Sequence, residues 1–160
     1  MIETRPIRDA DCAAIVNVAE ALPEWFDEDA RGRAMPIDLR HQQGFVALSG
    51  RQVVGFVTLF FAEGRVNIGW LGVHPEHQRK GIGAMLLRCA EEVGLQHGIT
   101  EISAYTLGSG VDYEPYERTR RFYFSQGFEI YQTSKTDNPG CSEEIKIKKE
   151  IAQQTNAPDA

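Results

Sequence analysis

The chain has 160 residues and a mass of 17.9 kDa, which is the size of one ordinary domain. Its 17 Lys and Arg residues against 23 Asp and Glu give a net charge of −6, which argues against a protein that coats nucleic acid with a basic surface. No apolar run approaches the ~20 residues of a membrane-spanning helix, and the N-terminus has no apolar signal core. We therefore expect a cytoplasmic protein without nucleic-acid or membrane partners.

The cysteines and histidines form neither a disulfide pattern nor a metal-binding pattern. Cys12, Cys89 and Cys141 are scattered without a C-x-x-C spacing, which is typical of reduced thiols, and the first two fall on the apolar stripes of expected helices. His74 and His77 lie in a proline-containing loop with no third ligand nearby. No metal site is predicted.

Hydrophobic periodicity and turn residues predict one mixed α/β domain with elements in the order β-α-α-β-β-β-α-β-α-β-β. The expected strands cover residues 2–7, 44–48, 52–61, 65–73, 99–106, 128–133 and 143–148. The expected helices cover residues 12–22, capped by Asp9 or Asp11, then 27–33 with a further turn at 36–43, 81–97 and 117–126. Turns are expected at 49–50, 63–64 and 137–140. We expect the domain to span residues 1–149 and residues 150–160 to form a frayed tail.

The stretch from Gln78 to Ala84 lies between a hydrophobic strand and a long helix. Glycines at 81 and 83 let the backbone approach a ligand closely, and the helix N-terminus offers free N–H groups, so the stretch is typical of a phosphate site. It is neither a Walker A loop nor a Rossmann fingerprint, since Leu86 stands at the third glycine position. An ordinary glycine-rich connection before a helix is the alternative for the two glycines alone.

Two motifs resemble those of the GCN5-related N-acetyltransferases. The first is Trp70-Leu71-Gly72-Val73-His74-Pro75-Glu76-His77-Gln78-Arg79-Lys80-Gly81-Ile82-Gly83, which is similar to the family's acetyl-CoA signature. The second is Arg121-Phe122-Tyr123-Phe124-Ser125-Gln126-Gly127-Phe128, which is similar to its helix-to-strand corner. The motifs stand in the family's order, and the resemblance covers about residues 2–149. It implies the acyl-CoA N-acyltransferase fold, a mixed, mainly antiparallel central sheet flanked by helices.

The resemblance also implies acetyl-CoA as cofactor, with CoA as product. By analogy, the amides of residues 79–84 hold the pyrophosphate, and Arg79 and Lys80 add positive charge. The strand end at 71–73 separates from its neighbour to bind the pantetheine arm, and the Val73 N–H stabilises the thioester oxygen as it becomes negative. The cofactor residues implied are Leu71, Gly72, Val73, Gln78, Arg79, Lys80, Gly81, Ile82, Gly83, Ala84 and Thr119. Core packing of the Leu71 and Val73 side chains is compatible with these backbone roles.

Tyr123 matches the family's general acid, which protonates the departing CoA thiolate; packing against the sheet is its structural alternative. The sequence departs from the family at the general base, because residues 68–70, about four before Val73, hold no carboxylate. A water chain or one of four loop carboxylates is the candidate base: Glu24, Asp27, Asp112 or Glu114. The family's asparagine contact to CoA is also missing, and Tyr116 or Thr119 is the candidate replacement.

For the amine acceptor, the resembled fold implies a cleft bordered by aromatic and acidic residues, which suit a cation. The residues concerned are Trp25, Phe26, Tyr105, Asp112, Tyr113 and Tyr116. Residues 9–30 and 111–117 contain several carboxylates and no Lys or Arg, which favours a cationic acceptor. The alternatives are that the tyrosines only fix their loop and that the acidic segments are solvated helix faces.

The sequence thus predicts an N-acetyltransferase that moves acetyl from acetyl-CoA to a primary amine of a small molecule or peptide. No cysteine lies near the glycine loop, so direct attack in a ternary complex is expected. A CoA-binding sensor or regulatory module without turnover is the alternative from another class. Many members of the resembled family form dimers, so a homodimer is compatible with the sequence, although no segment indicates an interface.

Overall fold

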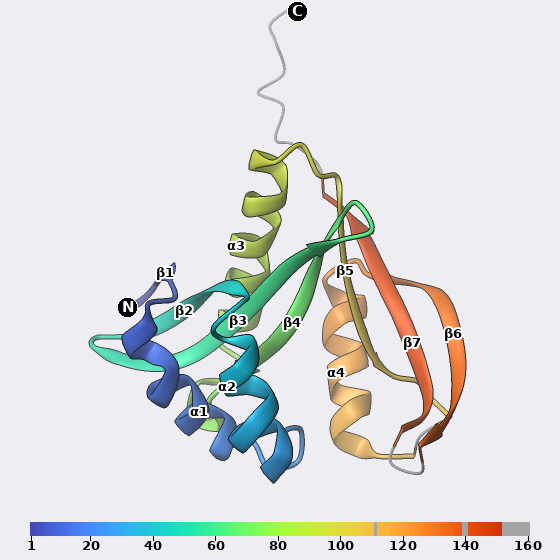
Figure 1. Ribbon diagram of the computed structural model, residues 1–160, viewed down its shortest axis with the longest axis horizontal. Helices are drawn as coiled ribbons and strands as arrows, with labels where there is room; N and C mark the ends of the chain where they lie inside the picture. Colours follow the sequence, from blue (N-terminus) through green and yellow to red (C-terminus); the bar gives the residue numbers. More distant parts are fainter. Residues whose placement is uncertain (111, 139–140, 152–160) are drawn as a thin grey trace, which may run out of the picture.

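The computed structural model describes residues 1–110, 112–138 and 141–151. Figure 1 shows a twisted sheet with helices against it. The described strands follow one another across the sheet in the order β1-β2-β3-β4-β5-β7-β6. Their bounds are β1 Ile2–Pro6, β2 Gln43–Ser49, β3 Gln52–Ala62, β4 Arg65–Val73, β5 Glu101–Leu107, β6 Glu129–Asn138 and β7 Cys141–Glu150. The helices are α1 Cys12–Glu20, α2 Met35–Asp38, α3 Ile82–Gln96 and α4 Glu114–Ser125.

Every neighbouring pair in this sheet is antiparallel except β4 and β5, which run parallel. Parallel neighbours need a crossover connection, and α3 provides it. The expected fold class, a mixed and mainly antiparallel sheet flanked by helices, is therefore confirmed.

The two short hairpins form where turn residues predict them. Glu63 and Gly64 both have positive φ, 55° and 72°, and join β3 to β4 by the two-residue turn that suits the strands' twist. Gly50 has φ 61° in the β2–β3 turn. Of the turn expected at 137–140, residues 139–140 lie outside the described residues.

The segment after α1 differs in detail from its expectation. The two expected pieces join into a continuous helical run that includes a π-helical stretch, Ala30–Ala34, before α2. The Asp27 side chain begins it by accepting from the Ala30 N–H at 2.8 Å. At the other end of the chain, β7 reaches Glu150, and Ile151 is buried against the core, two residues beyond the expected boundary.

The core has two parts because side chains alternate across each strand. Val46 and Phe56 pack with α1 and the segment after it, whereas their neighbours Ala47 and Val57 pack with α3. Tyr123 of α4 belongs to the same cluster as the α3 side chains. Helices therefore cover both faces, with α1 on one and α3 with α4 on the other.

The sheet opens between β4 and β5. Their ladder holds only Val66↔Ile102 and Asn67↔Ser103, so residues 68–73 have no partner on that side. Figure 1 shows the two halves of the sheet diverging below this point, with α4 beside the gap. The separation expected at 71–73 is therefore present, and the residues expected to bind the cofactor lie beside it.

Candidate active site

The glycine loop turns the chain into α3 and leaves the first amides of the helix without a helical acceptor. Gly81 is the N-cap and has φ 79°, a left-handed conformation that favours glycine. The first helical bond runs from Met85 N–H to Gly81 O, so the three amides before it, at residues 82–84, have no helical acceptor. A side chain at Gly83 would place its Cβ 3.0 Å from the Phe122 ring, which shows how closely α3 approaches α4 here.

A cavity of about 580 Å³ lies between this loop, the end of β4 and α4. Every cofactor residue expected from the sequence lines it, with the exception of Lys80, which is exposed. Among its described lining residues are three arginines and no carboxylate, so its charge suits an anionic ligand. The further lining residues are Leu22, Trp25, Phe26, His77, Arg118, Arg121, Phe122, Tyr123 and Gln126.

The end of β4 directs backbone groups into the open edge. Val73 lies opposite Gly55, and the next residue, His74, donates its N–H to Val54 O at 2.8 Å. In the alternating antiparallel pattern, the Val73 N–H and C=O therefore point away from β3, toward the side from which β5 has diverged. The Gln78 Nε2–H donates to the Val73 carbonyl oxygen at 3.0 Å, while the Val73 N–H remains directed at the gap.

Tyr123 reaches the same cavity from α4 while its ring is buried. Phe122 and Phe128 meet the ring nearly edge-on, with centroids 5.4 and 5.1 Å away. Burial raises the pKa of the Tyr123 phenol above its ordinary value, because the charged phenolate would lose its hydration. The hydroxyl therefore stays protonated, as a proton donor must.

Trp25 and Phe26 lie on the cofactor cavity instead of the second pocket described below. The Trp25 Nε1–H donates to both Pro115 O and Thr119 Oγ1 at 3.0 Å, and its ring lies 4.9 Å from the Arg118 guanidinium. Phe26 is buried and contacts Trp70 with ring centroids 5.9 Å apart. The segment after α1 is thus a wall of the cavity, tied to α4.

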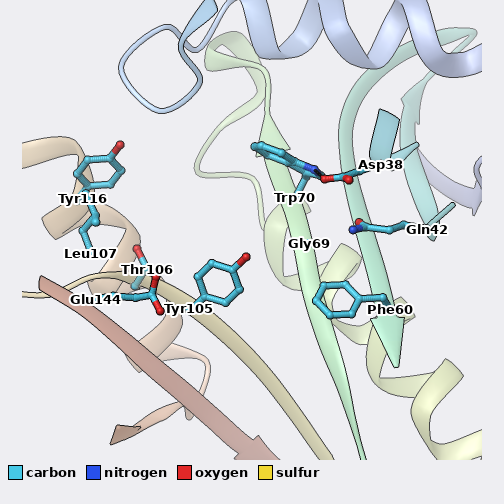
Figure 2. Close-up of a pocket in the computed structure, with 10 residues that line it drawn as sticks. All are labelled: Asp38, Gln42, Phe60, Gly69, Trp70, Tyr105, Thr106, Leu107, Tyr116 and Glu144. Carbon is cyan, nitrogen blue, oxygen red and sulfur yellow. Dashed lines mark hydrogen bonds between the residues drawn. The ribbon is translucent and has the colours of Figure 1, made fainter. Parts of the chain in front are cut away.

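A second pocket of about 310 Å³ lies in the gap between β4 and β5. Figure 2 shows Trp70, Gly69, Gln42 and Asp38 on one side and Tyr105 on the other, with its ring directed across the gap. The remaining lining residues are Phe60, Thr106, Leu107, Tyr116 and Glu144. In the described part of the chain, its lining contains two carboxylates and no basic side chain, the opposite of the first cavity.

Of the six expected acceptor residues, Tyr105 and Tyr116 line this pocket, whereas Trp25, Phe26, Asp112 and Tyr113 do not. Asp112 is exposed, and Tyr113 donates its hydroxyl to Glu24 O at 3.0 Å, which fastens the start of α4 to the segment after α1. None of the four candidate base carboxylates lines either pocket. Glu114, for example, pairs with Arg118 at 3.1 Å on the surface.

Sequence reasoning missed the carboxylates that do line the second pocket, Asp38 and Glu144. Asp38 ends α2 and accepts from Trp70 Nε1–H at 2.8 Å. Glu144 reaches the pocket through the pairing of β7 with β5, where it lies opposite Leu107. Neither residue belongs to a local motif, so only the long-range strand pairing and helix packing identify them.

Within the described ranges, no group of three or more His, Cys, Asp or Glu side chains is arranged to hold a metal ion. The same residues contain no helix that is both long and apolar enough to span a bilayer.

The sequence model of the acetyltransferase (GNAT) domain matches residues 40–130, more than half of the chain. The chain therefore belongs to the GNAT acetyltransferase family. Acetyl-CoA is the acyl donor of this family, which confirms the expected cofactor. No curated protein matches the sequence at a significant level.

Solved structures share the fold along nearly the whole chain. A GNAT-family acetyltransferase from Desulfovibrio desulfuricans is 22% identical with a TM-score of 0.82, covering 95% of this chain and 100% of the other. The PaiA N-acetyltransferase from Thermoplasma acidophilum, solved with coenzyme A, is 20% identical with a TM-score of 0.72, and the match covers 94% of this chain and 99% of the other. The ribosomal-protein-S18-alanine N-acetyltransferase from Escherichia coli is 15% identical with a TM-score of 0.72, and the match covers 98% of each chain.

Proposed function

We propose that this protein transfers the acetyl group of acetyl-CoA to a primary amine, by direct attack of the amine in a ternary complex. The observation that carries the proposal is that two pockets of opposite charge lie next to each other along β4, the acidic one at Gly69 and Trp70 and the basic one at residues 71–73. The basic cavity suits the anionic cofactor, and the acidic pocket suits a cationic amine. Reactants held on either side of one strand edge are brought together for reaction.

The cofactor cavity fits acetyl-CoA in charge and in backbone geometry. The free amides at the start of α3 are placed for the pyrophosphate, since a helix N-terminus attracts negative charge. Arg79 lines the cavity directly and adds positive charge, and Arg118 and Arg121 add it from α4. When bound, acetyl-CoA supplies a thioester carbonyl that an amine can attack.

Two groups of this chain are assigned to the acyl transfer itself. The Val73 N–H donates to the carbonyl oxygen as negative charge develops there, which is stabilisation of the oxyanion type. The Tyr123 hydroxyl donates a proton to the departing sulfur. Burial keeps the phenol protonated in the folded protein, so the proton is present on the Tyr123 oxygen when the thiolate forms.

The acceptor amine enters from the Trp70 side of the gap. Rings of Trp70, Tyr105 and Tyr116 line that pocket, and aromatic faces attract cations. With Asp38 and Glu144 in the same lining, the pocket favours an alkylammonium group over an acidic or neutral acceptor.

An acceptor screen tests the proposal. The protein is incubated with acetyl-CoA and spermidine, kanamycin, lysine or an alanine-initiated tripeptide, and release of free thiol is followed. We expect turnover of at least one amine. Tyr123→Phe should lower kcat by about 10²-fold or more while the KM for acetyl-CoA changes little. Tyr131→Phe is the matched control, because Tyr131 lies on β6 under Arg65 and lines neither pocket.

Tight binding of acetyl-CoA without turnover of any amine would favour a sensor or regulatory module and overturn the proposal. The cofactor site has its own test, since Gly81→Asp puts a negative charge and a strained φ at the start of α3. Unchanged CoA affinity in that variant would show that the cofactor binds elsewhere.

A further inference from the structure

The acceptor pocket is built around a residue without a side chain. Gly69 lies on β4 about four residues before Val73, and the Gln42 amide fills the space beside it. A Cβ added to Gly69 would contact Gln42 Oε1 and Thr58 Oγ1 at overlapping distances. The Gln42 Oε1 atom is buried, and no described group forms a hydrogen bond with it. Strand β4 thus offers no carboxylate at this point, and an amide, which cannot act as a base, stands in its place.

Glu144 supplies a carboxylate to this pocket from the opposite side of the gap. Figure 2 shows it beside Thr106 and Tyr105, across from Gly69 and Gln42. Its side chain is half-buried, and within the described ranges it takes part in no hydrogen bond or ion pair. A carboxylate that lines a pocket without an internal partner is free to bind a cation from solution.

The other carboxylate of the pocket is already engaged. Asp38 Oδ2 accepts the indole N–H of Trp70 at 2.8 Å, which fixes the ring that separates the pocket from Phe26. This contact makes Asp38 a positioning residue for the aromatic wall. Of the two carboxylates in this lining, Glu144 is therefore the one with both oxygens available to accept hydrogen bonds.

We infer that Glu144, across the gap from Gly69, is the group that binds the acceptor's ammonium and receives its proton, since β4 offers no carboxylate at residue 69. The inference rests on the proposed acetyl transfer. It assigns to β7 a role in proton transfer for which the sequence offered four loop carboxylates or a water chain.

With Glu144 as the base, each proton and bond of the acetyl transfer is accounted for. An ammonium nitrogen loses two protons as it becomes an amide. The first passes to Glu144 and from there to solvent, which the half-exposed carboxylate reaches at the pocket mouth. The C–N bond then forms and the C–S bond breaks. Tyr123 protonates the sulfur, and the second nitrogen proton restores the phenol. The net products are the amide, CoA thiol and one proton.

Several charged or titratable groups lie near the Glu144 carboxylate. On its own strand Lys146 lies on the same face, two residues along, and opposite it on β6 stands the uncharged Ser134. The titratable groups from other elements are the phenols of Tyr105 on β5 and Tyr116 on α4, and the Asp38 carboxylate across the pocket. The basic group that α4 contributes nearby, Arg120, donates to Leu107 O and Gly108 O at 2.7 and 3.0 Å.

The test is the pH dependence of the isosteric variant Glu144→Gln, measured with the screened amine that turns over fastest. At pH 7 we expect kcat/KM to fall about 10²-fold, because a positioned base is lost. The deficit should shrink progressively as the pH rises toward 10, because an alkylamine has a pKa of about 10.4 and its neutral fraction, which needs no base, grows steeply over this range. Glu144→Asp, which keeps a carboxylate, should recover part of the activity at pH 7.

Glu143→Gln is the matched control, since Glu143 faces the other side of β7 and accepts from the Gly110 N–H at 3.2 Å. Its activity should stay within about three-fold of wild type at every pH. If wild type and Glu144→Gln have nearly the same kcat/KM, or if the variant's deficit in kcat/KM is constant with pH, the assignment of Glu144 is overturned while acetyl transfer stays intact. The same holds if Asp38→Asn shows the pH-dependent deficit instead. A wild-type protein that acetylates no amine would overturn the proposed function and this inference together.

Discussion

The Trp25 indole N–H donates to Thr119 Oγ1 at 3.0 Å, and this bond joins the segment after α1 to α4 across one wall of the cofactor cavity. The Thr119 hydroxyl in turn donates to Pro115 O, one turn earlier in α4, at 3.2 Å. The two elements belong to different faces of the sheet, so the bond closes the cavity across the open edge between β4 and β5.

Trp25→Phe should weaken acetyl-CoA binding with little effect on the chemical step. The change keeps an aromatic ring against Arg118 but removes the N–H shared by Pro115 O and Thr119 Oγ1. One lost hydrogen bond corresponds to about 1 kcal/mol, so the KM for acetyl-CoA should rise about five-fold. Steady-state kinetics at saturating amine measure it. A fall in kcat with unchanged KM would contradict the role of this contact in holding the cavity.

Arg79→Asn should reduce cofactor affinity without destabilising the fold. Arg79 has φ 64°, a left-handed conformation that asparagine tolerates better than most residues, so the free energy of unfolding should be unchanged or slightly higher. The loss of a cation that lines the cavity should raise the Kd of CoA several-fold at low salt and less at high salt. Lys80→Asn removes the same charge from a neighbour outside the cavity and should have the smaller effect. Equal effects would mean that only overall charge matters.

Asp11→Asn should destabilise the protein at neutral pH and change its behaviour in acid. The hydrogen bonds from Arg5, at 2.7 and 3.0 Å, and from the Arg8 N–H lower the pKa of Asp11. A lowered pKa contributes stability above the carboxyl's ordinary pKa, and this is lost as pH falls through the folded-state value. Thermal unfolding from pH 7 to pH 3 should show wild type and variant converging in acid. Asp9→Asn, a neighbouring exposed carboxylate, should leave the pH dependence unchanged.

Gly69→Ala should be destabilising, and the cost should fall when Gln42 is shortened. A methyl group at 69 would overlap both Gln42 Oε1 and Thr58 Oγ1. Gln42→Ala removes the first contact, whereas Thr58 is fully buried and stays. A double-mutant cycle on the free energy of unfolding should therefore give a coupling of about 1 kcal/mol between the two sites. Additive effects would mean that the Gln42 side chain moves aside without cost.

The cofactor half of the site could be predicted from sequence because its signals are local. Gly81 and Gly83, the strand end before them and the Tyr123 corner follow one another with fixed spacings. The fold brings almost all of the expected cofactor residues onto one cavity. Trp25 and Phe26 lie far from α4 in the sequence, and they line the cofactor cavity instead of the expected acceptor pocket. Their placement depends on long-range contacts such as that of Trp25 with Thr119, which no local pattern indicates.

The acceptor half could not be predicted in the same way. Glu144 faces the pocket only because β7 inserts between β5 and β6, so that residue 144 pairs with Leu107. A shift of the register by one residue would turn Glu143 to that face instead, and no local pattern distinguishes the two glutamates. Asp38 depends likewise on how the helical run after α1 lies against Trp70.

The raised pKa of Tyr123 predicts that the protein loses stability in alkali more steeply than a Tyr123→Phe variant. Burial keeps the phenol protonated in the folded state at pH values where the unfolded chain, with a pKa near 10.0, has lost the proton. The contribution of Tyr123 to the free energy of unfolding is therefore constant well below pH 10. Above pH 10 it declines, relative to the variant, by about 1.4 kcal/mol per pH unit. Urea unfolding at pH 8, 9, 10 and 10.5 measures the difference, with Tyr131→Phe as the control for losing a phenol outside the cavity. If wild type and Tyr123→Phe keep a constant difference through pH 10.5, the Tyr123 hydroxyl is in contact with water and its proton is not held by burial.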